Sequence, residues 1–425
     1  MAKFQAPKGT HDVYPGARKW YENTRIWNHL ESVFRELTAL YGFEEIRTPV
    51  FESTSLFTRA VGEGTDIVAK EMYTFESKGR DSLTLRPEGT APALRAFIEN
   101  GIYAEGGVTK LYYIGPIFRY ERPQEGRFRQ HTQFGVEALG SQDPRLDAEI
   151  VHLALSFYRR IGLNRLVTKV NSVGCPQCRP AYREALLAFA RPIYDQMSED
   201  NQRRFQENPL RMLDSKDERD QALLADAPNI VDYICEECKT HFEAFKSSLT
   251  ALGAEYVLDP RLVRGFDYYT KTAFEVQSPD LGAQSTLCGG GRYDGLVQEL
   301  GGPSTPGIGF GLGVERVLIA LQKLDRQPDA VGGPKAFLVT LGDAARDASL
   351  KILIDLRAAG VAADTDYAGR SVKAQMRAAN KSGAPFALVL GDDELAKGVV
   401  QVKTMETGEQ AEVPIADLTA MLAAA

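Results

Sequence analysis

Four arginines lie within residues 119–129, in the stretch FRYERPQEGRFRQ: Arg119, Arg122, Arg127 and Arg129. Arg119 directly follows the apolar run YYIGPIF, which is typical of a strand, so a rigid element would fix its guanidinium. A planar donor that is always charged suits a phosphate. The polar, turn-forming residues that follow indicate a mobile loop able to close over a nucleotide. The alternative is a solvated hairpin whose arginines pair with Glu121 and Glu125.

A second candidate segment is PGIGFGLGVERVLIAL, in which four glycines alternate with apolar residues. Side chains alternate with period two in a strand, so Gly307, Gly309, Gly311 and Gly313 would share one face and form a backbone floor for a flat ring such as adenine. Arg316 comes where a helix begins, a position that favours anions. Close packing between strands is the alternative reason for the glycines. A Rossmann fingerprint is not indicated, because no βαβ unit surrounds the segment.

Two further segments bring charged residues to turns. LVRGFDYYTKTAFEV places Arg264 before a strand that begins near Tyr268 and Tyr269, and LRPEGTAPALRAF places Glu88 and Thr90 before a helix. A core strand with one charged end and simple helix capping by Thr90 are the respective alternatives.

The chain has no nucleophile elbow or P-loop, and its five histidines lack a metal or triad context. Arginine, glutamate and tyrosine together favour phosphoryl or nucleotidyl transfer, which needs positioning and charge neutralisation.

The elements that would position these residues fall into distinct regions. An apolar repeat over residues 20–41 predicts an amphipathic helix ended by Gly42. FEEIRTPVFE predicts a strand in which Pro49 removes a ladder donor and marks an edge, or an interface where the strand leaves the sheet. Residues 71–140 read as strands joined by turns, hence an antiparallel sheet.

The rest of the chain completes an α+β organisation. Residues 171–255 are helical and charged, which indicates an inserted module, and a Pro/Gly-containing linker precedes a small α/β domain. The predicted boundaries are 1–170 and 256–325 for the antiparallel domain, 171–255 for the helical insertion, 326–335 for the linker and 336–425 for the α/β domain.

Bulk properties limit the class of protein. The 425 residues are 44% hydrophobic and 25% charged, with a net charge of −7 and a mean hydropathy of −0.26. No apolar stretch has the length needed to span a bilayer, and the N-terminal residues lack the apolar core of a signal peptide, so we expect a cytoplasmic protein without a membrane partner. An acidic protein must bind any polyanion through local basic patches.

One such patch is predicted near the C-terminus. Arg370, Lys373, Arg377 and Lys381 recur at steps of three and four, which gives one basic stripe along a helix. A solvated helix face is the alternative, but charge gathered on one surface is what phosphate binding requires.

Four of the five cysteines form two C-x₂-C pairs, Cys175/Cys178 and Cys235/Cys238, with residues 179–234 between them. Two such pairs can form a structural Cys₄ zinc site if the fold brings them together. Ordinary buried or surface thiols are the alternative.

Taken in order, these segments resemble the class II aminoacyl-tRNA synthetases, and within that class the histidyl-tRNA synthetase family. YGFEEIRTPVFE, FRYERP…GRFRQHTQFGVEALG and GIGFGLGVERVLIAL resemble the three class motifs, while LVRGFDYYT and GGGRYDGL resemble two signatures of the histidine enzymes. The start PKGTHDVYP is similar to theirs as well. The resemblance covers the whole chain and implies a catalytic domain with a helical insertion, an anticodon-binding domain and a homodimer formed around Pro49.

The resemblance also implies a reaction and residue roles. Histidine and ATP would give histidyl-adenylate and pyrophosphate, with Mg²⁺, and the histidyl group would then pass to tRNA(His). The implied ligands are these: Arg119 and Arg264 for the α-phosphate, Arg316 with Gly309 and Gly311 for the rest of ATP, and Glu88, Gly89, Thr90, Gln133, Glu137, Arg264, Tyr268 and Tyr269 for histidine. The implied tRNA contacts are Arg122, Arg127 and Arg129 at the acceptor end and Arg370, Lys373 and Arg377 at the anticodon.

Two other functions fit parts of the pattern. A noncatalytic relative that regulates the first enzyme of histidine biosynthesis typically lacks the terminal domain and the arginine of VRGFDYY, and this chain has both. A tRNA-binding sensor that charges nothing would not need Arg119, Arg264 and Arg316 together.

Overall fold

The computed structural model describes residues 4–62, 65–326 and 333–424. The chain forms two compact units, residues 1–329 and 330–425, each with its own core. The predicted linker falls largely on residues 327–332, outside the described residues. In the part that is described, no helix is long and apolar enough to cross a membrane.

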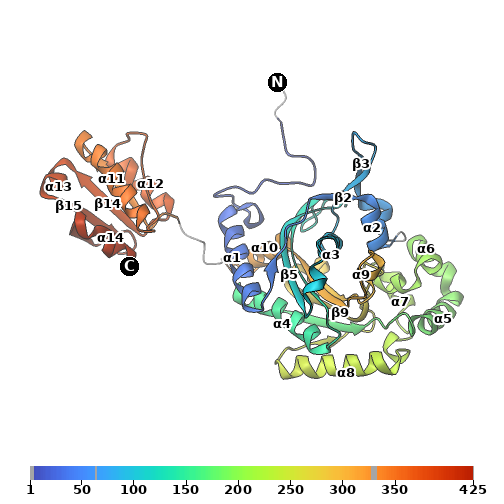
Figure 1. Ribbon diagram of the computed structural model, residues 1–425. Coiled ribbons are helices and arrows are strands. Elements are labelled where there is room, and N and C mark those ends of the chain that lie inside the picture. The colour runs from blue at the N-terminus through green and yellow to red at the C-terminus, as the bar shows by residue number, and fades with distance from the viewer. Residues whose placement is uncertain (1–3, 63–64, 327–332, 425) are drawn as a thin grey trace. The chain divides into compact units, whose positions relative to one another are not determined.

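The first unit is built on an eight-stranded sheet whose six inner strands are antiparallel, as predicted (Figure 1). The short edge strands β1 and β8 instead pair in parallel with β5 and β7. In spatial order the strands are β1 (Glu44–Glu45), β5 (Thr109–Phe118), β6 (Gln130–Leu139), β11 (Gly307–Gly313), β10 (Thr286–Arg292), β9 (Thr270–Gln277), β7 (Val167–Ser172) and β8 (Val257–Leu258).

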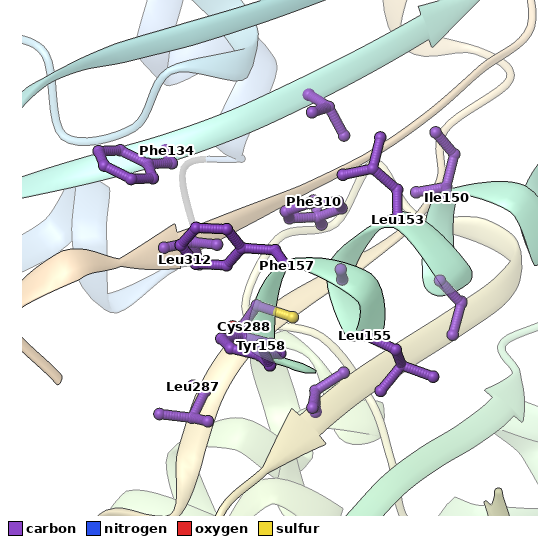
Figure 2. Close-up of a cluster of buried hydrophobic side chains, with 14 of the residues drawn as sticks. Phe134, Ile150, Leu153, Leu155, Phe157, Tyr158, Leu287, Cys288, Phe310 and Leu312 are labelled. Atoms are coloured by element: carbon purple, nitrogen blue, oxygen red, sulfur yellow. The ribbon is translucent and has the colours of Figure 1, made fainter. Parts of the chain in front are cut away.

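Period-two alternation gives this sheet two different faces. Phe134, Phe310 and Leu312 are buried in a core that includes Phe157 and Tyr158 of α4 (Figure 2). The other helices that pack into this core are α1, α8 and α10. Their bounds are α1 (Thr24–Leu40), α4 (Pro144–Arg160), α8 (Glu236–Ala251) and α10 (Val314–Lys323). The glycines of β10 and β11 that alternate with these apolar residues are left on the opposite face.

The predicted strand around Pro49 is wrong in one respect, because it is two strands in two sheets. β1 ends at Glu45, and β2 (Phe51–Ser53) joins a separate three-stranded sheet of order β2-β4-β3. Pro49 lies between the two strands, where the chain passes from one sheet to the other, and a proline has no N–H to continue a ladder. The other members of this sheet are β3 (Tyr73–Glu76) and β4 (Ser82–Leu85). Helix α2 (Thr54–Val61) contacts this sheet and also α3 (Thr90–Glu99) and α9 (Leu296–Glu299).

Between β7 and α8 the chain is mostly helical, with α5 (Arg179–Ala190), α6 (Glu199–Glu207) and α7 (Glu218–Leu223) joined by short 3₁₀ segments. Tyr182, Leu186 and Met212 are fully buried and share a core with Tyr268 and Tyr269. The helical segment is therefore packed against the strand entry that carries the two tyrosines.

The second unit has a five-stranded mixed sheet of order β13-β12-β14-β15-β16 with helices on both faces. Its strands are β12 (Ala336–Leu341), β13 (Ala363–Thr365), β14 (Phe386–Gly391), β15 (Val399–Thr404) and β16 (Gln410–Pro414). Its helices are α11 (Asp343–Ala358), α12 (Val372–Ser382), α13 (Asp392–Lys397) and α14 (Ile415–Ala424). This is the α/β domain that the sequence predicts.

Candidate active site

A cavity of about 260 Å³ lies against the glycine-bearing face of the large sheet. Segments far apart in the sequence meet there. Of the predicted residues, the lining includes Glu88, Thr90, Arg119, Arg127, Gln133, Arg264, Tyr268, Tyr269, Gly309, Gly311 and Arg316. Glu137 is not on the lining but is buried beside Gly309.

The glycines of this face make room for the side chains of the site. A Cβ at Gly289 would lie 2.1 Å from Nη2 of Arg264, and one at Gly309 would lie 2.2 Å from Oε2 of Glu137. At Gly311 it would lie 2.2 Å from Nε2 of Gln133. The expected bare floor is therefore partly covered at Gly309 and Gly311, whereas a Cβ at Gly313 would meet nothing within 4 Å.

The three arginines are each fixed by a hydrogen bond. Arg119 follows β5 and donates from Nε to the carbonyl of Pro87 (2.7 Å). Arg264 donates from Nη1 to Oε1 of Glu275 (2.6 Å). Arg316 donates from Nε to the carbonyl of Gly126 (2.9 Å) and from Nη1 to that of Thr286 (3.1 Å). Their remaining N–H groups can meet a polyanion in the cavity.

His131, which sequence reasoning missed, lies in the positive electrostatic field of Arg119 and Arg316. It lines the cavity, and burial together with the charges of Arg119 and Arg316 lowers its pKa to about 3. Its ring is therefore uncharged at neutral pH and adds no further positive charge to the cavity.

A buried carboxyl group lies behind the cavity wall, against the lining residues Thr90, Tyr113 and Tyr293. Glu137 is 1% exposed and accepts hydrogen bonds from Oγ1 of Thr90 (2.8 Å) and from the hydroxyls of Tyr113 (3.3 Å) and Tyr293. Burial raises the pKa of Glu137 to about 8. Sequence reasoning missed both tyrosines. Tyr113 lies on β5 opposite Gly135, two residues from Glu137 on β6, so the strand register was the signal that could have found it.

The turn before α3 does not show the capping by Thr90 that was the alternative to a functional role for this segment. The Glu88 carboxylate, not the threonine hydroxyl, accepts from the backbone N–H groups of Thr90 (2.6 Å) and Ala91 (2.7 Å). Burial raises the pKa of Glu88 despite these bonds. The hydroxyl of Thr90 is thereby free to donate to Glu137.

Several buried polar atoms on the lining have no hydrogen-bond partner within the described chain. They are Oε1 of Gln133, Nε of Arg264, the hydroxyl of Tyr268 and Oε2 of Glu315. Such atoms are rare in folded proteins and mark the places where a ligand's polar groups fit. Tyr268 also packs against Tyr269, with ring centroids 4.6 Å apart.

A second cavity of about 590 Å³ shares Arg119, Arg127, Arg264 and Arg316 with the first. Its other wall comes from the segment after α6 and includes Asp214 and Lys216. Burial, followed by the charge of Arg127, lowers the pKa of Lys216. Sequence reasoning missed these two residues, because the run LDSKDERD resembles any solvated charged segment.

The arginine-rich loop is folded back on itself. Arg127 pairs with Glu121 (3.2 Å), and Arg129 donates to the carbonyl of Glu121 (3.4 Å) while lying over the Tyr120 ring. Arg122 is exposed. Of the three predicted tRNA contacts in this loop, only Arg127 also lines the cavity.

The two remaining groups of predicted residues lie outside the cavity. The sulfurs of Cys175, Cys178, Cys235 and Cys238 all lie within 4.8 Å of one another. On α12, Lys373, Arg377 and Lys381 are exposed, while Arg370 precedes the helix and is paired with Asp366 (2.6 Å).

Comparison with known proteins identifies the family. The model of the histidyl-tRNA synthetase family matches residues 9–317, and that of an anticodon binding domain matches residues 335–425. The histidine–tRNA ligase of Moorella thermoacetica is 52% identical over 96% of both chains. That of Caldanaerobacter subterraneus subsp. tengcongensis is 48% identical over 97% of this chain and 98% of its own. The solved structure of apo S. aureus histidyl-tRNA synthetase has a TM-score of 0.82 and 40% identity, and covers 99% of this chain and 100% of its own. Because these matches run along nearly the whole length, the chain belongs to the histidyl-tRNA synthetase family of class II aminoacyl-tRNA synthetases.

Proposed function

We propose that the cavity performs both steps of this family's reaction, the ATP-dependent joining of L-histidine to tRNA(His). Histidine and ATP form histidyl-adenylate with release of pyrophosphate, and the histidyl group then passes to the 3′-hydroxyl of the terminal adenosine. The observation that carries the proposal is the convergence of Arg119, Arg264 and Arg316 on one cavity beside a buried carboxyl group.

In the first step the arginines would act on the phosphates. The carboxylate of histidine attacks the α-phosphorus, and the negative charges of the two groups oppose the attack. Arg119 directly follows β5 and Arg264 lies in the segment between β8 and β9. They would therefore hold the α-phosphate from two sides and stabilise the charge of the transition state. Arg316 would bind the outer phosphates. Adenine would lie on the part of the glycine face left open at Gly313, because Glu137 and Gln133 occupy the space over Gly309 and Gly311.

Histidine would be recognised by the polar groups at the other end. Glu88, Thr90 and Gln133 would take its ammonium group, with Gly89 in the same turn, and Glu137 with Tyr268 and Tyr269 its imidazole. An apolar amino acid in this pocket would leave the buried Oε1 of Gln133 and the hydroxyl of Tyr268 unpaired. Discrimination on the order of 10⁴-fold follows from such a penalty without an editing site.

Two cofactors belong to the proposal. Mg²⁺ would arrive with ATP as part of the substrate complex, and the carboxylates of Glu121 and Asp214 in the second cavity are ligands of the kind it takes. When bound, Mg²⁺ neutralises charge on the phosphates. One Zn²⁺ at the four clustered cysteines would have a structural role outside the cavity.

The tRNA would contact both units. Arg122, Arg127 and Arg129 would meet the acceptor end near the cavity. Arg370, Lys373 and Arg377 would meet the anticodon, in the unit that matches an anticodon binding domain.

We also propose that the chain works in the cytoplasm as a homodimer formed around Pro49. Large apolar side chains are exposed on the neighbouring surface, with exposed fractions of 40% for Val50, 47% for Phe51, 43% for Phe75 and 53% for Tyr120. An exposed apolar group of this kind is typical of an interaction surface.

The test is ATP–pyrophosphate exchange with each of the twenty amino acids on the wild type and on Arg264→Ala. We expect exchange with histidine alone, reduced at least about 10²-fold in the variant. Exchange with no amino acid in a folded protein would instead favour the regulatory function, and tRNA binding without exchange would favour the sensor.

A further inference from the structure

The four clustered cysteines have the spacing of ligands around one metal ion. Cys175 and Cys178 have their sulfurs 3.5 Å apart, Cys175 and Cys235 3.8 Å, and Cys178 and Cys238 3.8 Å. Zinc–thiolate bonds of about 2.3 Å in a tetrahedron place the sulfurs about 3.8 Å apart. The cluster therefore has the size that a single tetrahedral ion requires.

Other uses of the four thiols fit less well. A disulfide needs its sulfurs about 2.05 Å apart, and all four cysteines are free. A four-iron cluster would hold its cysteine sulfurs farther apart than the 4.8 Å limit found here. Tetrahedral thiolate ligation by four cysteines is typical of Zn²⁺.

The backbone and side chains around the cluster favour cysteine sulfurs that bind a metal. The backbone N–H of Cys175 lies 3.0 Å from Sγ of Cys178, an orientation in which it donates to that sulfur. Gly174 has a φ of +65°, and a Cβ there would lie 2.9 Å from the same sulfur. Arg179 is the next residue after Cys178, and its positive charge would offset the negative charge of four thiolates around a divalent ion.

The neighbours of the cysteines contact the strand entry that carries Tyr268 and Tyr269. Lys271 donates its backbone N–H to the carbonyl of Gly174 (2.8 Å), and its own carbonyl accepts from Val173 (2.7 Å). Its ammonium group donates to Glu237 (2.8 Å), which lies between Cys235 and Cys238. Arg179 in turn donates to the carbonyl of Asp267 (3.4 Å).

Lys271 also adopts a φ of +51°, which L residues seldom adopt. Its two backbone bonds to residues 173 and 174 hold it in that conformation. Both ends of the segment 267–271 are thus held by residues adjacent to the cysteines.

We infer that Zn²⁺ bound by Cys175, Cys178, Cys235 and Cys238 fastens the two ends of the helical segment together and thereby positions residues 267–271 beside the histidine pocket. Binding converts the four thiols to thiolates, whose protons pass to solvent. The effect on histidine recognition rests on the proposed function, whereas the metal site itself does not.

The first experiment measures metal in the full chain. The protein purified under reducing conditions should contain one zinc per chain by elemental analysis, and cobalt replacement should give the visible bands of a tetrahedral thiolate site. Cys235→Ser and Cys238→Ser should lose the metal, whereas Cys288→Ser, a buried cysteine outside the cluster, should keep it. Free thiols with no bound metal after incubation with Zn²⁺ would overturn the inference, as would disulfides among the four.

The second experiment tests the coupling on the wild type, so it does not depend on the folding of a variant. Removing the metal with a chelator should speed hydrogen exchange in residues 171–180, 234–241 and 264–272, while β12 of the other unit stays protected. The KM for histidine should rise about 10-fold, in line with the loss of groups that orient a site. Unchanged exchange in 264–272 and unchanged KM would show that the metal does not position this segment.

A matched pair of variants separates the coupling from metal binding. Glu237→Ala removes the contact with Lys271, whereas Glu236→Ala removes a neighbouring acid on the same turn. Both should retain one zinc, and only Glu237→Ala should raise the KM for histidine. Equal KM values would contradict the coupling. A zinc-loaded wild type with no histidine-dependent exchange would instead refute the proposed function.

Discussion

At the scale of single residues, the cavity is defined by close pairs of a glycine and a functional side chain. Arg264 lies over Gly289, Glu137 over Gly309 and Gln133 over Gly311, each closer than a Cβ would permit. Glycine is therefore needed at these positions for what lies above it, since none of the three has a positive φ. Substituting such a glycine displaces the side chain that it accommodates.

Gly289→Ala tests this arrangement most directly. The new Cβ would meet the guanidinium of Arg264 at 2.1 Å, so the arginine must move although its charge remains. Misplacement by about 1 Å can reduce a rate about 10²-fold, and we expect that loss in histidine-dependent ATP–pyrophosphate exchange. Gly295→Ala is the matched control, because its Cβ would meet only Glu299, at an ordinary 3.7 Å. Equal rates in the two variants would contradict this account of Gly289.

Glu315 gives a prediction about pH. Its Oε1 accepts from the backbone of Thr132 (2.8 Å), its Oε2 has no partner in the described chain, and burial raises its pKa from 4.5 to about 8. The folded protein retains this proton where the unfolded chain releases it. The associated stability is complete below pH 4.5 and is lost as the pH rises through about 8, by a few kcal/mol in all.

Glu315→Gln should therefore flatten the fall in the free energy of unfolding between about pH 5 and about pH 8, because an amide stays neutral. Urea unfolding of both proteins at several pH values measures the difference. Glu137 has a similarly raised pKa and is present in both proteins, so its contribution cancels. Parallel pH profiles would show that Glu315 is ionised in the folded protein.

Sequence reasoning reached some of these residues and missed others for a physical reason. Arg119 was predicted because the preceding apolar strand and the loop after it are adjacent in the sequence. Tyr293 was missed as a partner of Glu137, because the two are brought together only by the pairing of β10, β11 and β6. The capping of α3 by Glu88 was missed as well, because it depends on the direction of the side chain, which the spacing of residues in the sequence does not indicate.

At the scale of elements, a buried polar network joins α4, α8 and the central strands. Asp147 of α4 accepts from Arg292 of β10, from His241 of α8 (2.8 Å) and from Thr272 of β9 (2.6 Å). Burial alone would raise the pKa of Asp147, but the bond from His241 and the charge of Arg292 lower it. One carboxylate thus holds α8 and the sheet to the same helix.

Removing that carboxylate should destabilise the unit strongly. Asp147→Ala leaves the fully buried Arg292 without its main partner, and breaking such a pair costs about 3–5 kcal/mol. Asp143→Ala, at the partly exposed N-cap of the same helix, should cost only about 1 kcal/mol. Denaturant unfolding of both variants checks the contrast, and similar losses would mean that Arg292 finds another partner.

The elements themselves were largely predictable, since they follow from periodicity. The repeat over residues 20–41 corresponds to α1 at Thr24–Leu40. The segment around Pro49 was only partly predictable. The proline indicated a break in the hydrogen-bond ladder, but nothing in the sequence indicated that β2 would join another sheet. Where the helical segment packs was not predictable either, because its contacts with Tyr268 and Tyr269 are between residues distant in sequence.

At the scale of the whole molecule, the proposed dimer depends on the apolar surface near Pro49. Phe51→Asp should shift the protein from dimer to its 46.8 kDa monomer at micromolar concentration, because a carboxylate would be buried in the interface. Leu350→Asp is the control, since Leu350 is similarly exposed (54%) but lies on α11 of the second unit. Sedimentation velocity distinguishes the species, and two dimers or two monomers would contradict the proposed surface.

The second unit gives the last prediction, which separates tRNA binding from chemistry. Lys373 and Arg377 lie exposed on α12, opposite the buried Ala379, so no core packing depends on their charges. If each neutralises a phosphate, Lys373→Ala with Arg377→Ala should lower the slope of log binding constant against log salt by about 1.4–1.8 and raise the KM for tRNA. Lys351→Ala on α11 removes another exposed charge, which is paired with Asp355, and should leave both quantities unchanged. Histidine-dependent ATP–pyrophosphate exchange needs no tRNA and serves as the check that the first unit is intact. A salt slope that is the same in all three proteins would place the tRNA contact of this unit on another surface.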